Sequence, residues 1–261
     1  MKKTLLTICL VWMCFSLSAQ KIIDLSGKWS FSIDRQDNGE KEKWFSHTLN
    51  DFINLPGSMP EKLKGDEVTA KTQWTGSLYD SSYYYNPYME KYRKEGNIKF
   101  PFFLTPDKHY VGAAWYQKEV NIPADWKGER ILLFLERPHI ETTVWVNGQK
   151  TGIQNSLCVP HQYDITRYVR PGKCTITIRV DNRIKEINVG PDSHSITDQT
   201  QGNWNGIVGR ICLQTTPKTY FDDIQIYPEP EQKLARVKVV IKGTGTAKVK
   251  LSAESFNTDK K

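Results

Sequence analysis

The chain has 261 residues, of which 38% are hydrophobic, and its 36 lysines and arginines exceed its 29 aspartates and glutamates to give a net charge of +7. The basic residues are scattered along the sequence, whereas a nucleic-acid-binding protein gathers them in one motif or on one face. Composition therefore argues against nucleic-acid binding, and the length suits one large domain with part of a second.

Residues 1–19 have the pattern of a secretory signal peptide. Lys2 and Lys3 supply positive charge, Thr4–Phe15 is a short apolar run, and Ser16–Ala19 offers small residues for cleavage. A membrane anchor is the alternative, but the run is short for one, and no later stretch is apolar enough to span a membrane. We expect an exported protein, periplasmic or extracellular, with a mature net charge of +5 after loss of the two lysines.

The predicted mature chain keeps three cysteines, Cys158, Cys174 and Cys212. Export permits a disulfide, but because three is odd, at least one thiol is free or pairs between chains. None has a CxxC partner, so we expect mainly buried, inert thiols that pack as small hydrophobic side chains.

Alternation of apolar and polar residues dominates the stretch from 20 to 228 and predicts β-strands. Strands are predicted, in chain order, at Trp29–Ile33, Ala114–Val120, Ile131–Leu135, Thr142–Val146, Cys174–Val180, Ile207–Gln214 and Asp223–Tyr227. Cys174–Val180 is typical of a half-buried strand, with Ile176, Ile178 and Val180 on its apolar face. Asn147-Gly148 favours a tight hairpin turn. No stretch has long helical periodicity, so the predicted fold is an all-β sandwich or jelly roll.

Two segments interrupt the strand pattern. Gln73–Tyr110 is a long irregular excursion that holds seven of the twelve tyrosines, and long loops of this kind are usually functional or disordered. Its aromatic content argues against disorder, because such rings bury large areas. The second segment, Val189–Gly209, is polar and rich in Gly, Asn and Asp.

The end of the chain predicts a second unit. Pro228–Glu231 resembles a linker, and Ala235–Lys242 and Thr246–Phe256 alternate as two strands around Gly243–Gly245. Two strands alone are marginally stable. Residues 229–261 are therefore interpreted as a linker and the first strands of an incomplete sandwich.

The sequence offers few signals for catalysis or metal binding. Glycosidases need two paired carboxyl groups, and the sequence pairs none of Glu119, Glu136 and Glu141, which fit ordinary strand ends. The five histidines lack metal-ligand spacing, and Cys158–His161 has no second pair. There is no GxSxG elbow, and Gly202–Gly209 lacks the context of a phosphate-binding loop. We therefore predict no catalytic residue, metal or cofactor.

Sugar recognition is the remaining chemistry. Saccharides are bound by flat aromatic faces together with amides and carboxylates that fix hydroxyl groups. Asp198–Gly206 has this composition, and so does the excursion with Asp107, His109 and Tyr110. The alternative is that these side chains only anchor their own loops. Both interpretations stay open for Asp198–Asn205, and loop anchoring is favoured for the Tyr79–Tyr92 cluster.

Eight short segments resemble the opening domain of family 2 glycoside hydrolases, and they occur in that family's order. They are Asp24–Phe31 (DLSGKWSF), Leu55–Ser58 (LPGS), Ala114–Lys118 (AWYQK), Ile122–Trp126 (IPADW), Val144–Gly152 (VWVNGQKTG), Tyr163–Thr166 (YDIT), Val180–Arg183 (VDNR) and Trp204–Gly209 (WNGIVG). Each motif is weak by itself, but together they span nearly all of the stretch from Asp24 to Tyr227. The excursion at 73–110 and the Gly209-Arg210 pair depart from the commoner pattern.

The resemblance implies a sugar-binding jelly roll at 20–228, then an immunoglobulin-like domain, then a TIM barrel that carries two catalytic glutamates. The family includes β-galactosidases, β-glucuronidases and β-mannosidases. No catalytic residue carries over to this chain, because the glutamates belong to the barrel. Loops of the first domain can reach the sugar cleft, which nominates five residues as cleft-edge sugar contacts: Asp198, Asn203, Trp204, Asp107 and His109.

Three hypotheses follow. The chain is the N-terminal fragment of an exported family 2 glycosidase whose partners are a β-linked saccharide and the missing immunoglobulin-like and barrel domains. Alternatively, it is a free-standing carbohydrate-binding module, as its aromatic and amide-rich loops suggest. The third hypothesis, an enzyme active by itself, is the one that the sequence argues against.

Overall fold

The computed structural model describes residues 21–76, 81–102, 104–185, 190, 192–244 and 248–254. The predicted signal peptide, residues 1–19, lies outside the described residues, as does Tyr79 of the tyrosine cluster. None of the helices within the described ranges has the length and apolar character that crossing a bilayer requires.

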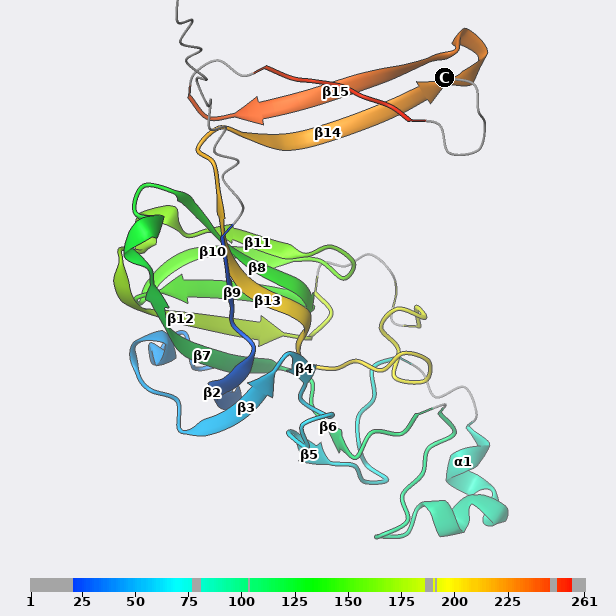
Figure 1. Cartoon of the computed structure of the whole chain (residues 1–261). Coiled ribbons are helices and arrows are strands. Elements are labelled where there is room, and N and C mark those ends of the chain that lie inside the picture. Colours follow the sequence, from blue (N-terminus) through cyan, green and yellow to red (C-terminus); the bar gives the residue numbers. More distant parts are fainter. Residues whose placement is uncertain are drawn as a thin grey trace, which may run out of the picture.

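Two antiparallel sheets pack face to face as a β-sandwich of jelly-roll type (Figure 1). The larger sheet has the order β10-β9-β12-β7-β2-β3. Its strands are β2 (Gly27–Asp34), β3 (Asp51–Leu55), β7 (Ala113–Ile122), β9 (Glu141–Val146), β10 (Gln149–Asn155) and β12 (Gly172–Asp181). The smaller has the order β1-β13-β8-β11, with β4 also on β13. Its strands are β1 (Ile22–Asp24), β4 (Gly57–Ser58), β8 (Arg130–His139), β11 (His161–Asp164) and β13 (Gly206–Thr216).

The inward faces of the two sheets form one hydrophobic core. Trp29 and Phe31 from β2, Tyr116 from β7 and Leu133 from β8 are at most 1% exposed within it. The all-β prediction is confirmed, and its strands fall on β2, β7, β8, β9, β12 and β13. The predicted turn after β9 is also present, since Asn147 and Gly148 both have positive φ, 50° and 77°.

β12 differs from its prediction as a half-buried strand. Its outward residues Thr177 and Arg179 are only 1% and 7% exposed. The reason is a second hydrophobic cluster on the outer face of the larger sheet, where Trp115 and Trp145 pack 4.9 Å apart. The segment before β3 covers them through Trp44 and Phe45, the latter stacked on Trp145 at 5.2 Å. Sequence periodicity cannot reveal such a cover, because it comes from a distant part of the chain.

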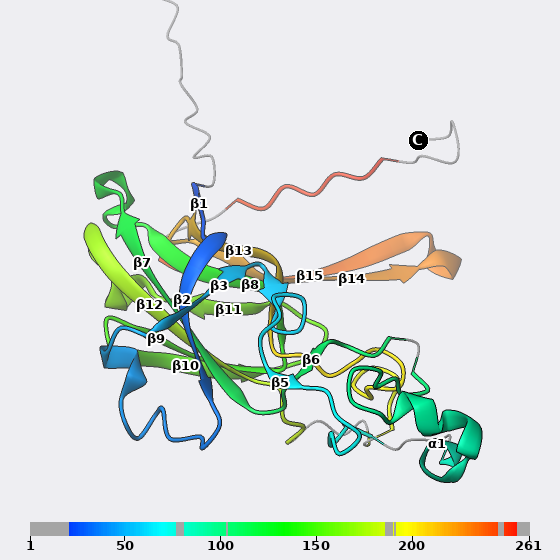
Figure 2. The same cartoon turned by 90° about the horizontal axis from the view of Figure 1, so that it is seen from below.

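Short elements occupy the irregular excursion, and Figure 2 shows it projecting from one side of the sandwich. β5 (Asp66–Glu67) pairs with β6 (Lys108–His109), which closes the excursion at its base. The elements between them are α1 (Ser82–Tyr85) and the 3₁₀ turn Pro87–Tyr92. The other 3₁₀ turns are Trp44–Ser46, Ala124–Trp126, Thr166–Tyr168 and Pro230–Gln232.

The last two strands form a separate hairpin that stands away from the sandwich (Figures 1 and 2). Among the described strands, β14 (Tyr220–Glu229) pairs only with β15 (Leu234–Lys242). The interpretation of Pro228–Glu231 as a linker is therefore wrong, because these residues end β14 and enter the hairpin turn. Residues 248–254 form no strand, so the described chain does not pair Ala235–Lys242 with the segment predicted to follow it. The apolar side chains Ile224 and Ile226 are 53% and 65% exposed.

We predict that removing residues 220–261 leaves the sandwich folded. The hairpin shares no sheet with it, and the deletion removes the stacking of Arg130 on Tyr220 at 3.8 Å. Stacking of this kind contributes about 0.5–1 kcal/mol, so the melting temperature should fall by no more than about 4 °C. Limited proteolysis of the intact chain should likewise trim the hairpin first. A hairpin that resists protease until the core melts would contradict this expectation.

Candidate functional site

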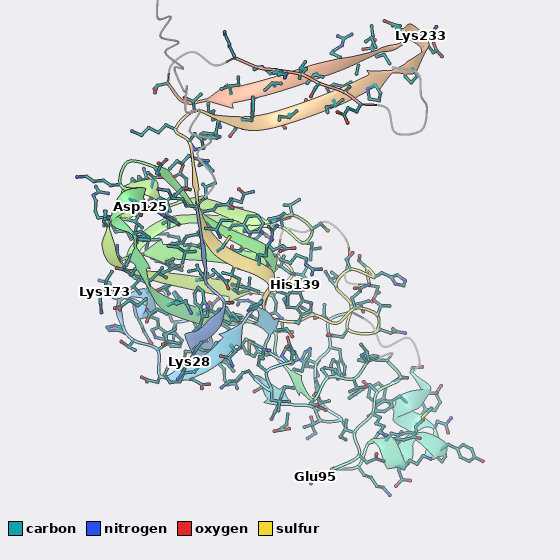
Figure 3. The ribbon with its side chains drawn as sticks, viewed as in Figure 1. Lys28, Glu95, Asp125, His139, Lys173 and Lys233 are labelled. Atoms are coloured by element: carbon teal, nitrogen blue, oxygen red, sulfur yellow. The ribbon has the colours of Figure 1, made fainter. Side chains whose placement is uncertain are left out.

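Two irregular segments meet at one side of the sandwich, near His139 in Figure 3. The amide of Asp198 donates to the carbonyl of Thr75 at 3.1 Å, and the amide of Thr75 donates to Asp198 Oδ2 at 2.7 Å. Thr197 Oγ1 also donates to the Thr75 carbonyl at 3.2 Å. These bonds tie the start of the excursion to the polar segment before β13, although more than 120 residues separate them.

The Asp198 carboxylate is the centre of this junction. It accepts a hydrogen bond from the amide of Asn203 at 2.7 Å, and His109 Nε2 lies 3.2 Å from its Oδ2. Asp198 is 5% exposed and His109 6%. The indole of Trp74 packs edge-on against the His109 ring at 4.6 Å. The structure thus brings two nominated residues together, but inside the junction.

Asn203 is a third nominated residue that is buried here. Its Nδ2 donates to Thr75 Oγ1 at 2.9 Å and to the carbonyl of Asn182 at 3.0 Å. The neighbouring Asn205 accepts from the Tyr116 hydroxyl at 2.7 Å and donates to two strand-end carbonyls. Sequence analysis does not nominate Asn182 or Asn205 as site residues. The motifs Val180–Arg183 (VDNR) and Trp204–Gly206 (WNG) contain the sequence signal that could have found them. Each has an asparagine beside apolar residues, and a buried amide can both donate and accept hydrogen bonds.

Trp204 is half-buried, and its ring stacks on the ring of His139 at 4.6 Å with the planes 20° apart. Burial lowers the pKa of His139 to about 4, an effect that the Asn203 amide and the Asp198 charge partly oppose. His139 Nε2 and Asn203 Oδ1 are both buried without a hydrogen bond of good geometry among the described residues. The amide nevertheless lies near enough to favour the charged imidazole.

Within the described residues, Asp107 shares no hydrogen bond or ion pair with the other four nominated residues. It is exposed and borders a hollow of about 1060 Å³ between segments 67–71 and 93–107. The floor of this hollow includes Phe100 and Phe102. These rings belong to the aromatic cluster that fills the excursion, in which Trp74 contacts both of them edge-on and Tyr83 packs on Phe100 at 4.7 Å.

The tyrosine-rich part of the excursion divides into anchored and exposed rings. Tyr83 is 1% exposed, whereas Tyr84, Tyr85 and Tyr88 are 52%, 73% and 86% exposed. Loop anchoring therefore accounts for Tyr83, and the other three rings are open to solvent.

A polar hollow of about 490 Å³ lies beside the Asp198 junction. Its walls carry a guanidinium, a planar amide, hydroxyls and carboxylates, the groups that bind saccharide hydroxyls. The lining residues that carry them include Arg35, Asp66, Thr72, Gln73, His109 and Tyr110. Sequence reasoning found only His109 and Tyr110 among these. The pairing of Asp66 with His109 and the ion pair of Arg35 with Asp66 bring two of the others beside them.

Within the described parts of the chain, no three His, Cys, Asp or Glu side chains converge as metal ligands. Cys174 and Cys212 are buried and Cys158 is exposed, and all three are free thiols.

The profile of the family described as "Glycosyl hydrolases family 2, sugar binding domain" matches residues 22–217. The chain therefore belongs to glycosyl hydrolase family 2, and these residues form its sugar-binding domain. The curated relatives that it resembles are about three times as long as the part of them that aligns with this chain.

Two β-glucuronidases illustrate the relationship. That of Homo sapiens is 24% identical over 266 residues, covering 91% of this chain and 35% of that protein. That of Paenibacillus borealis is 25% identical over 222 residues, covering 79% and 31%. The chain thus spans about a third of the length of these relatives.

Solved structures show the same fold. The β-glucuronidase of an uncultured Clostridium sp. superposes with a TM-score of 0.58 at 20% identity, covering 86% of this chain and 34% of that one. The β-glucuronidase of Ruminococcus gnavus gives a TM-score of 0.58 at 18% identity, with the same coverage.

Replacing Asp198 with alanine should destabilise the domain. The change leaves the partly buried backbone amide of Thr75 and the buried backbone amide of Asn203 without an acceptor, which costs about 2–4 kcal/mol in the free energy of unfolding. Asp198→Asn, which keeps one acceptor oxygen, should lose less. Urea denaturation measures both, with the exposed Gln201→Ala as the control. If Asp198→Ala lowers the free energy of unfolding no more than the control does, Asp198 does not stabilise the junction.

The stability of the domain should fall as pH drops from about 6.5 to 4. Burial lowers the pKa of His139 and His161 from 6.5 to about 4, so the unfolded chain binds more protons than the folded one in that interval. Protonation of each histidine lowers the free energy of unfolding by roughly 3 kcal/mol at most over this interval.

Melting temperature against pH measures this effect. His139→Phe keeps an aromatic ring against Trp204 and should flatten the profile, whereas the exposed His47→Gln should leave it unchanged. Equal profiles for His139→Phe and the unsubstituted chain would contradict the assignment. Carboxylates with a lowered pKa, such as that of Asp37, do not affect the profile in this interval. The stability that they contribute is lost only when the pH falls below the ordinary pKa of 3.8.

Proposed function

We propose that this chain is the N-terminal, sugar-binding part of an exported family 2 glycoside hydrolase that hydrolyses O-glycosyl bonds in its full-length form. The family match over residues 22–217 carries this proposal. Export rests on the leader pattern of residues 1–19. The hairpin of β14 and β15 is proposed as the first part of an immunoglobulin-like domain, and a barrel with the catalytic glutamates would follow it.

The proposed substrate is a β-linked saccharide, with β-glucuronides as the first class to test. The names of the relatives support that choice. On the protein side, the support is the polar hollow beside His109, where Arg35 offers a cation for a sugar carboxylate. Arg35 is already 2.8 Å from Asp66, so a uronate would have to share or displace that pairing.

The nominated residues take two roles in this proposal. Asp198, Asn203 and His109 hold the two loops together, because they form hydrogen bonds within the junction. Trp204 and Asp107 keep accessible surface and are the remaining candidates for sugar contact. A half-buried indole offers a flat apolar face to the C–H side of a sugar ring.

A free-standing carbohydrate-binding module is the second candidate. The observation that favours it is the same polar hollow, which the chain forms from its own residues between β5, β6 and Gln73. Binding without turnover by the purified chain fits both candidates. Only the glycosidase proposal requires a downstream reading frame that encodes the remaining domains.

The purified chain should bind glucuronic acid or a short glucuronide and release no nitrophenol from p-nitrophenyl β-glucuronide. Gln73→Ala removes a planar amide from the hollow and should weaken binding about tenfold. The control is Gln154→Ala, a glutamine on β10 outside the hollow. Isothermal titration calorimetry and an absorbance assay give the two readouts. Turnover by the purified chain would overturn the proposal that this part is inactive by itself. Equal affinities of the two variants would show that the hollow is not the sugar-binding site.

A further inference from the structure

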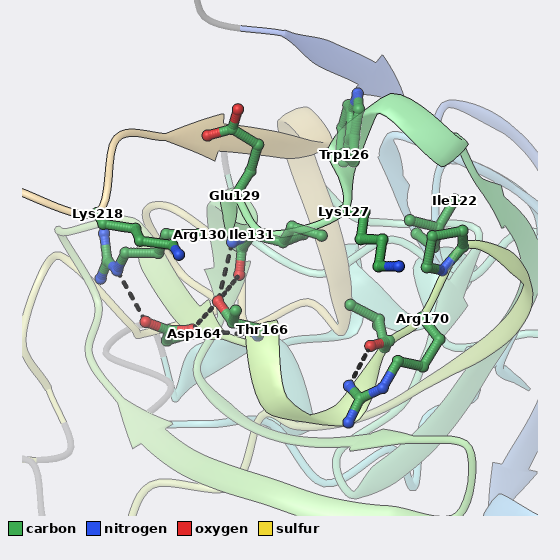
Figure 4. Close-up of a pocket in the computed structure, with 13 residues that line it drawn as sticks. Ile122, Trp126, Lys127, Glu129, Arg130, Ile131, Asp164, Thr166, Arg170 and Lys218 are labelled. Carbon is green, nitrogen blue, oxygen red and sulfur yellow. Dashed lines mark hydrogen bonds and ion pairs between the residues drawn. The ribbon is translucent and has the colours of Figure 1, made fainter.

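A second hollow of about 570 Å³ opens at the end of the sandwich where the two sheets part (Figure 4). Ile122 is the last residue of β7 in one sheet, and Ile131 is the second residue of β8 in the other. The 3₁₀ turns Ala124–Trp126 and Thr166–Tyr168 lie at its edges. Figure 3 places Asp125, next to this hollow, on the side of the sandwich away from His139 and Glu95. The second hollow is therefore distinct from the saccharide site proposed above.

The floor of the hollow is apolar. Ile122, Trp126, Ile131 and Val169 line it, and each is between 2% and 4% exposed. They belong to the main hydrophobic core, and the hollow meets the edge of that core here. Trp126 is nearly buried, so it does not present an open aromatic face of the kind that saccharides use. The floor suits an apolar body rather than a sugar ring.

Four cations from three segments surround this floor: Lys127, Arg130, Arg170 and Lys218 (Figure 4). Arg130 is neutralised, since its Nε lies 2.8 Å from Asp164 Oδ2. The other three form no ion pair within the described part of the chain, although ion pairs are frequent elsewhere on this surface. Arg170 donates only to backbone carbonyls, of Val169 at 2.6 Å and Arg167 at 3.5 Å. In Figure 4 the Glu129 carboxylate points away from these cations.

We propose that this hollow binds a small anionic molecule with an apolar body, such as an aryl or alkyl sulfate, sulfonate or carboxylate. The apolar part would occupy the floor, where it removes hydrophobic surface from water. The anionic group would meet Lys127 and Arg170, whereas Figure 4 shows Lys218 on the opposite side of the hollow. The volume lies in the range of small-molecule sites, which combine apolar walls with a few placed polar groups.

The test titrates the purified chain with 2-naphthalenesulfonate by calorimetry. Two companion probes separate the parts of the proposal: neutral 2-naphthalenesulfonamide has the same body without the charge, and sodium sulfate has the charge without the body. We expect binding of the sulfonate, with at least tenfold weaker binding of either companion. No binding of the sulfonate, or equal binding of a companion, would overturn the proposal.

Charge reversal locates the binding. Lys127 is exposed and its ammonium group forms no hydrogen bond or ion pair with the described residues, so Lys127→Glu should preserve the fold and weaken sulfonate binding about tenfold or more. Adding Arg170→Glu should abolish it. Lys41→Glu makes the same charge change outside the hollow and is the control. Thermal melting of each variant confirms folding, and equal affinities of Lys127→Glu and Lys41→Glu would exclude this site.

Discussion

The structure depends most on the need of buried backbone groups for hydrogen-bond partners. Two long segments, irregular over most of their length, lie against the sandwich without joining either of its two sheets, and an unpaired buried amide or carbonyl is costly. Asp198, Asn203, Asn182 and Asn205 meet this need with short polar side chains that bond to the backbone of distant segments. The shape of the proposed saccharide site follows from these bonds, because they fix the walls around it.

The strand that leads into this junction is held by a buried network of charges. Asp181 at the end of β12 is fully buried and contacts Arg179, Arg183 and Lys185 at 2.6–3.0 Å. Burial alone would raise the pKa of Asp181, but the hydrogen bonds from Arg183 and Lys185 and the charge of Arg179 hold it well below its ordinary value. Arg179 also reaches Asp37 at 2.6 Å, which fastens the segment covering the outer face of the larger sheet. Core, cover and junction are thus linked through one strand end.

The candidate site was only partly predictable. Its polar composition pointed to Asp198, Asn203 and His109, and the structure brings these together. The same reasoning placed Asp107 with them, yet Asp107 lies before β6 at a bend, where strand alternation does not apply. Gln73, Thr72 and Arg35 escape prediction because each is an ordinary polar residue in the sequence, and only the folded chain places them around one hollow.

The sequence by itself determined the all-β class, most strand positions, the turn at Asn147-Gly148 and the family, because these depend on local alternation and short motifs. Only the tertiary structure decided which strands pair. Asp223–Tyr227 has the same alternating pattern as a sandwich strand, yet it forms β14 and pairs with β15. Only the tertiary structure also showed that Thr177 and Arg179 are buried and that Asp198 is enclosed. Pairing and burial depend on what a distant segment supplies, and a local pattern carries no information about its partner.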